Sequence, residues 1–143
     1  MNKTLLHSIA ASCTLLFALS TADAAVDASI ARQTSPSGIA YASGGVGDAR
    51  QDAMEAIRKD YNLQLTFARP KSGDYVIDVK VKVENAKHEN VLEVVSSGPL
   101  FFASLPAGKY TVTADAEGQP QTRRATISKR HTSALVFYFP ERN

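Results

Sequence analysis

The sequence predicts a small, mainly β protein, a seven-stranded antiparallel sandwich preceded by one short amphipathic α-helix. The first observation behind this prediction is that apolar and polar side chains alternate with a period of two from Leu63 onward. The second is that glycine- and proline-containing turns recur roughly every 8 to 12 residues, as in sandwiches and small barrels. The third is the missing strand–helix–strand alternation of a parallel sheet. With 143 residues, the chain has the length of one domain.

Residues 1–24 have the layout of a secretory signal peptide. Lys3 supplies a positive start, Leu5–Leu19 form an apolar run, and Ala22-Asp23-Ala24 is a small-x-small site, so cleavage is expected after Ala24. The apolar run, at about 15 residues, is too short to span a bilayer as a permanent helix. We therefore expect a periplasmic or secreted protein with no stable membrane insertion after cleavage.

The composition excludes a disulfide in the mature chain and gives no reason to expect a nucleic-acid partner. Cys13 is the sole cysteine and lies in the signal peptide, so the mature chain must fold without a disulfide. A net charge of +2 provides no electrostatic footprint for nucleic acid, and no such partner is expected.

Residues 25–37 are small and polar and are expected to form a disordered leader. The β-sandwich domain is then expected over residues 38–140. Its first element is a short strand at Gly38–Ser43, where Ile39 and Tyr41 alternate with alanines.

A helix is predicted over residues 48–61. Asp48 suits the N-cap, Gln51 completes a capping box, and Asn62 suits a left-handed residue after the helix. Four apolar residues share one helical face: Ala53, Met54, Ile57 and Tyr61.

Seven strands follow from the two-residue period. The clearest begins at Tyr75 and ends at Glu84, with its apolar side chains expected to face the core and its charged ones the solvent. The inward side chains of this strand are Tyr75, Ile77, Val79, Val81 and Val83. The other six strands are expected at Leu63–Phe67, Val91–Val95, Leu100–Leu105, Tyr110–Ala114, Gln121–Ser128 and Ala134–Phe139.

One hairpin is the most distinctive motif of the chain. In the string Leu105-Pro106-Ala107-Gly108-Lys109-Tyr110-Thr111-Val112, Leu105 ends one inward row, Pro106 and Gly108 make a tight turn, and Tyr110 resumes the inward row. It follows the turn Ser97-Gly98-Pro99 and an aromatic strand.

On these motifs, Val91–Ile127 resembles the carboxypeptidase regulatory-like domain, a transthyretin-like β-sandwich related to the collagen-adhesin B-type repeats. Tyr41–Gly47 and Tyr61–Ala68 extend the resemblance to small exported proteins of Gram-negative bacteria that carry this domain. The resemblance implies the fold and the compartment. It implies an accessory, adhesive or spacer role, with no activity of its own.

No catalytic, cofactor-binding or metal-ligating set is predicted. His88 and His131 both fall in predicted turns, and neither has a ligand or carboxylate at a useful spacing. The run Gly44–Gly47 before the helix is better explained as a turn than as a phosphate cradle, because Asp48 puts a carboxylate where an anion would bind.

The densest basic cluster flanks the last hairpin and is the candidate binding surface: Arg123, Arg124, Lys129 and Arg130. It suits an envelope protein or an acidic glycan, although such charges also keep an exposed hairpin soluble. The predicted function is a non-catalytic binding or structural module. One alternative is a carbohydrate-binding module, for which Phe101 and Tyr138 are the available rings. Another is an enzyme of unknown type, which requires a cleft joining His88 or His131 to a carboxylate.

Overall fold

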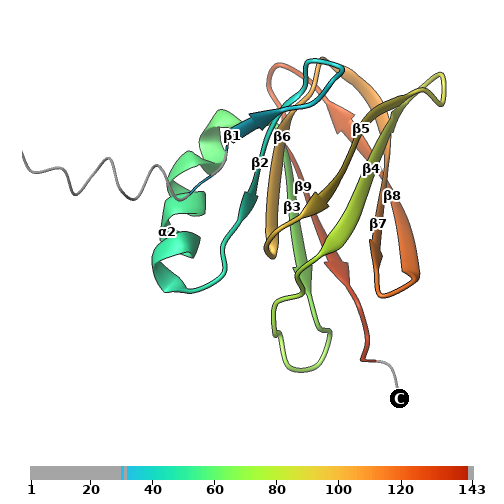
Figure 1. Ribbon diagram of the computed structural model, residues 1–143. Coiled ribbons are helices and arrows are strands. Elements are labelled where there is room, and N and C mark those ends of the chain that lie inside the picture. Colours follow the sequence, from blue (N-terminus) through green and yellow to red (C-terminus); the bar gives the residue numbers. More distant parts are fainter. Residues whose placement is uncertain (1–29, 31, 142–143) are drawn as a thin grey trace, which may run out of the picture.

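The computed structural model describes Ile30 and residues 32–141, which fold as two facing β-sheets with one helix outside them (Figure 1). The predicted signal peptide and residues 25–29 lie outside the described residues. The first sheet has five strands in the order β1-β2-β6-β3-β9, and the second has four in the order β5-β4-β7-β8. The mainly β sandwich architecture is therefore confirmed.

The bounds of the elements follow the sheets. The five-stranded sheet contains β1 (Arg32–Thr34), β2 (Ala40–Gly44), β6 (Leu100–Ser104), β3 (Leu63–Ala68) and β9 (Ser133–Tyr138). The four-stranded sheet contains β5 (Asn90–Ser96), β4 (Val79–Asn85), β7 (Gly108–Ala116) and β8 (Gln119–Ile127). Between β2 and β3 lie helix α2 (Asp48–Ile57) and the short 3₁₀ turn η1 (Arg58–Asp60).

The main core lies between the two sheets and is built from alternate residues of nearly every strand. Its largest rings are Phe67, Phe101, Phe137 and Phe139, all fully buried. The predicted inward positions of Leu105, Tyr110 and Val112 are confirmed, because all three are buried in this core. The predicted hairpin is wrong, because β6 belongs to the five-stranded sheet and β7 to the four-stranded sheet, so the turn carries the chain from one sheet to the other. The Tyr110 hydroxyl donates to the Pro106 carbonyl at 2.7 Å, which closes the turn between β6 and β7.

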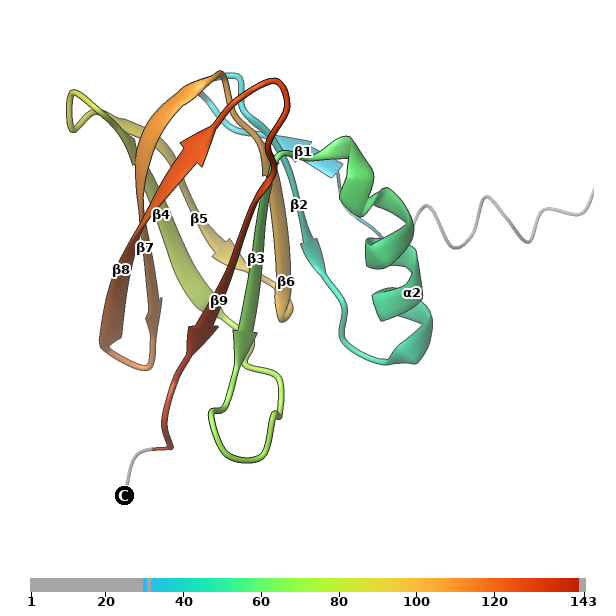
Figure 2. The same ribbon diagram turned by 180° about the vertical axis from the view of Figure 1, so that it is seen from behind.

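A second core lies on the outer face of the five-stranded sheet, where α2 packs beside β2 (Figures 1 and 2). The predicted apolar face of the helix is buried there. Tyr61 packs on Phe102 with the ring centroids 6.1 Å apart, and the Arg58 guanidinium lies 5.1 Å from the same ring. The members of this second core are Ile30, Ala42, Ala53, Met54, Ile57, Tyr61, Leu100 and Phe102.

The beginning of the fold differs from the prediction. Arg32–Thr34 form β1, paired with β2, where a disordered leader was expected. The N-cap is Gly47, at a φ of 85°, and Asp48 is already helical and makes no capping hydrogen bond, so the predicted capping box is wrong. The α-helix ends at Ile57 and η1 continues to Asp60, so the predicted helix is too long.

The described residues contain nine strands rather than seven, and one pair is parallel. β3 and β9 pair in parallel, with Leu63 opposite Ser133 and Phe67 opposite Phe137. The chain visits the other sheet twice between these strands, so β9 returns to the first sheet in the direction of β3. Alternation reports which face of a strand is buried but not the direction of its neighbour, which explains why the antiparallel prediction is wrong for this pair.

The strand predicted from Tyr75 is wrong in its first half. Tyr75 and Ile77 are 51% and 49% exposed, whereas Val76 between them is buried. Before Asp78 the chain still borders the first sheet, because the Val76 N–H donates to the Phe67 carbonyl at 3.1 Å. Asp78 then adopts a left-handed φ of 56°, and β4 starts in the second sheet at Val79. This one residue reverses the alternation.

We predict that Leu105→Asp prevents folding, since it places a carboxylate in the main core, at a cost of more than about 4 kcal/mol. Ala107→Asp is the matched control, because Ala107 is exposed in the same turn and the change there should cost less than about 0.5 kcal/mol. Circular dichroism melts compare the two. A cooperative melt of Leu105→Asp near that of the wild type would contradict the placement of Leu105 in the core.

We also predict opposite effects of two changes at Asp78. Asp78→Val should lower the free energy of unfolding by about 1–2 kcal/mol, because a β-branched residue resists left-handed φ, and Asp78→Gly should leave it equal or higher. Urea denaturation measures both. Asp74→Val, at an exposed residue of ordinary φ in the same connection, is the control and should change stability less.

Candidate binding surface

The predicted basic cluster does not form one surface. Arg123 pairs with the buried Val112 and so lies on the inner side of β8, where its guanidinium sits 5.5 Å from the Phe137 ring. Arg124 pairs with Thr111 and faces the outer side of the four-stranded sheet. Adjacent strand residues point to opposite faces, so these two arginines cannot bind one ligand side by side.

The other two members of the cluster lie in the turn after β8. Lys129 and Arg130 border an open hollow of about 360 Å³ together with Asp60 of η1, and Asp60 is paired with Arg32 at 3.7 Å. Both side chains are exposed. The four predicted residues are thus divided among three places.

The two histidines are held apart by the fold. His88 lies in the β4–β5 turn at a φ of 62°, beside a hollow of about 240 Å³ that Lys109 and Arg124 also line. His131 lies in the β8–β9 turn and borders the same open hollow as Asp60, so one histidine and one carboxylate do share a hollow, but Asp60 is already paired with Arg32 at 3.7 Å. Within residues 30 and 32–141, no three histidine, cysteine or acidic residues gather closely enough to hold a metal ion.

The outer charges of the four-stranded sheet also pair locally. Lys82 donates to Glu84 at 2.9 Å, and this hydrogen bond, with the charge of Glu84, raises the pKa of Lys82. These residues are successive members of the outward row of β4, as the alternation predicts.

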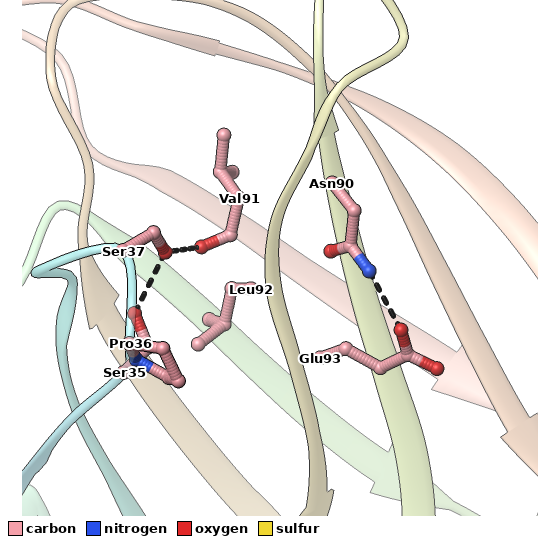
Figure 3. A pocket seen from close by; sticks show the side chains of 7 residues that line it. All are labelled: Ser35, Pro36, Ser37, Asn90, Val91, Leu92 and Glu93. Atoms are coloured by element: carbon pink, nitrogen blue, oxygen red, sulfur yellow. Dashed lines mark hydrogen bonds between the residues drawn. The ribbon is translucent and has the colours of Figure 1, made fainter.

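A hollow of about 210 Å³ lies where the β1–β2 turn meets β5 (Figure 3). The Ser37 hydroxyl donates to the Val91 carbonyl and lies 2.9 Å from the Ser35 hydroxyl. Nearby, the Asn90 amide donates to Glu93 at 2.6 Å. These polar groups satisfy one another, so we assign the contact a structural role in covering the start of β5.

The outer face of β3 and β9 carries an exposed pair of aromatic rings. Of the two rings considered from the sequence, Phe101 is buried and stacked on Tyr41, whereas Tyr138 is 49% exposed. The partner of Tyr138 is Tyr75, which the sequence placed in the core. Tyr75 and Tyr138 are both paired with Ala68, on its two sides, so all three point to the same face of the sheet.

We call this surface the tyrosine face and define it by Thr66, Ala68, Tyr75, Val136 and Tyr138. Thr66 pairs with Val136 one step along the ladder, and Val136 is among the exposed large apolar side chains. None of the five carries a charge. On the side toward α2 the face ends at Gln64, whose amide donates to the Arg58 carbonyl at 3.0 Å and whose oxygen accepts from the Arg58 guanidinium.

Two sets of contacts hold the tyrosines in place. Tyr138 lies in β9, where its carbonyl accepts a hydrogen bond from the Gln121 amide of β8. Tyr75 follows a turn in which the Arg69 N–H donates to the Asp74 carbonyl at 2.7 Å, and the Gly73 N–H donates to the Arg69 carbonyl at 3.1 Å. Gly73 has a φ of 75°, which favours glycine there.

A hollow of about 380 Å³ lies beyond the ends of the same two strands. It is lined by Arg69, Pro70, Lys71 and Ser72 from the β3–β4 connection and by Pro140 and Glu141 after β9. The Arg69 guanidinium donates to the carbonyls of Phe139 and Pro140 at 3.1 and 3.2 Å and pairs with Glu117 at 3.2 Å. The described end of the chain is therefore fastened beside the loop that carries Tyr75.

Comparison with known proteins adds no identification. No family model matches the chain, and no curated protein matches it significantly. In the part of the chain that the structure describes, α2 and η1 are too short and too polar to cross a membrane.

We predict that Arg123→Ala and Arg124→Ala have different effects on stability although the residues are neighbours. Loss of the contact between Arg123 and Phe137 should lower the free energy of unfolding by about 1 kcal/mol. Arg124→Ala, on the outer face, should change it by less than about 0.5 kcal/mol. Urea denaturation of both variants is the measurement. Equal effects would mean that the two arginines share one environment.

Proposed function

We propose that the protein is a non-catalytic binding module that acts in the periplasm or after secretion, and that the tyrosine face is its binding surface. The observation that carries the proposal is that Tyr75 and Tyr138 are each about half exposed on one uncharged face. Tyrosine combines a large apolar ring with a hydroxyl, and it dominates binding energy at many interfaces.

The chemistry of the face favours binding over catalysis. Its five residues are threonine, alanine, valine and two tyrosines, and the set lacks the histidine, carboxylate or lysine that most often serves as a general base. The hollow lined by Arg69, Lys71 and Glu141 lies at the same end of the molecule as the two tyrosines. The Arg69 guanidinium in this hollow is already bound to Glu117 and to two backbone carbonyls. The proposed role is retention of a partner by contact alone.

The compartment is part of the proposal and rests on the layout of residues 1–24. Family membership is likewise proposed: the buried positions of Leu105, Tyr110 and Val112 around the turn between β6 and β7 support a carboxypeptidase regulatory-like domain. A domain of this kind, exported into the envelope, meets envelope polymers and envelope proteins. We therefore place its partner in the envelope, and we locate the contact on the tyrosine face instead of the divided basic cluster.

We predict that the wild-type protein co-sediments with purified Gram-negative envelope fragments and that the double variant Tyr75→Ala/Tyr138→Ala does not. Both side chains are exposed, so their truncation should leave the fold intact by circular dichroism. Val95→Ala is the matched control, since Val95 is 56% exposed on the outer face of the other sheet. No sedimentation of the wild type, or equal sedimentation of the double variant, would contradict the proposed function.

A further inference from the structure

We propose that the ligand of the tyrosine face is an extended, uncharged, β-1,4-linked glycan chain, with alternate sugar rings stacked on Tyr75 and Tyr138. This inference rests on the proposed function and gives it a ligand class. It differs from the acidic glycan expected from the basic residues, because it uses a different surface and different chemistry.

The first argument is the spacing set by the ladder. Tyr75 and Tyr138 flank Ala68 in neighbouring positions of the sheet, so their Cα atoms lie two strand spacings apart, about 10 Å. In an extended β-1,4-linked chain, successive rings are turned over, and every second ring presents the same face. The distance between such equivalent rings is close to two strand spacings. A chain crossing the strands can therefore offer equivalent faces to both tyrosines.

The second argument is the small residue between the rings. Ala68 lies between the two tyrosines, carries only a methyl group and is 7% exposed, so a sugar ring between the two stacked ones would pass above a residue that is already buried. A bulky residue here would hold the chain off the sheet. Thr66 and Val136 form the next row, and the hydroxyls of Thr66 and of the tyrosines provide hydrogen-bonding groups at the edges of the stacked chain.

The third argument concerns charge and area. The tyrosine face is uncharged, which suits neutral rings. β9 has six residues, so the strip that residues 32–141 leave uncovered between α2 and the sheet edge measures about 20 Å by 15 Å, or roughly 300 Å². A stable protein–protein interface buries about 800 Å² on each partner. The strip is too small for such an interface but has room for a short stretch of one polymer chain.

The test is isothermal titration calorimetry with purified β-1,4-linked oligomers of glucose and of N-acetylglucosamine, from one to six sugars long. We expect affinity to rise steeply up to three sugars, the shortest length that reaches both tyrosines, and to level off beyond. Tyr75→Ala and Tyr138→Ala should each weaken binding of the longer oligomers at least tenfold, and Val95→Ala should not. The α-1,4-linked glucose oligomers are the matched ligand control and should bind at least tenfold more weakly, because their chain curves.

Absence of binding to every β-linked oligomer at about 10 mM, or binding that survives loss of both tyrosines, overturns the glycan inference. The envelope experiment separates this failure from failure of the proposed function. If tyrosine-dependent sedimentation persists without oligomer binding, the protein is a binding module for another ligand. If protease treatment of the envelope abolishes that sedimentation, the ligand is a protein and the glycan inference is wrong.

Discussion

The packing of Phe67 against Phe137 and Phe139 is the interaction on which the rest of the structure depends. The ring centroids are 6.0 and 6.4 Å apart, in the middle of the space between the sheets. Phe67 and Phe137 are also direct partners in the parallel ladder of β3 and β9. Because side chains alternate along a strand, turning these rings inward sends the next residues, Ala68 and Tyr138, outward as a pair. The binding surface we propose is the reverse side of the aromatic core.

The same core explains how the side of the sandwich between β8 and β9 is covered. β8 and β9 are edge strands of different sheets, and polar side chains of β8 cover the edge of β9. Gln121 donates to the Tyr138 carbonyl, Gln119 donates to the Pro140 carbonyl at 3.3 Å, and Arg123 covers the Phe137 ring. Arg123, which the sequence alone suggests is a surface charge, thus helps to protect a strand edge. This explains why Arg123 and Arg124 do not act together.

Much of the fold could be predicted because local patterns determine it. The helical face of α2 and the inward side chains of the Leu105–Val112 segment follow from periodicity and turn chemistry, which depend on near neighbours. The direction of β9 depends on the path of the chain through two sheets, and no local pattern encodes it. Tyr75 was misplaced for a related reason: a regular alternation was extended across Asp78, and the only signal of the break is a short polar residue able to adopt left-handed φ.

The two tyrosines belong to parts of the molecule with very different backbone support. Tyr138 sits in a continuous ladder of six residue pairs, whereas Tyr75 is joined to the sheet by an isolated bridge to Ala68 in the middle of a long connection. Opening of that connection therefore costs less free energy than unfolding of the strands, and it removes half of the aromatic surface while the sandwich stays intact. A molecule that touches both rings must hold the connection closed, so part of its binding energy is spent on suppressing local opening, and amide exchange in residues 69–77 slows when the surface is occupied.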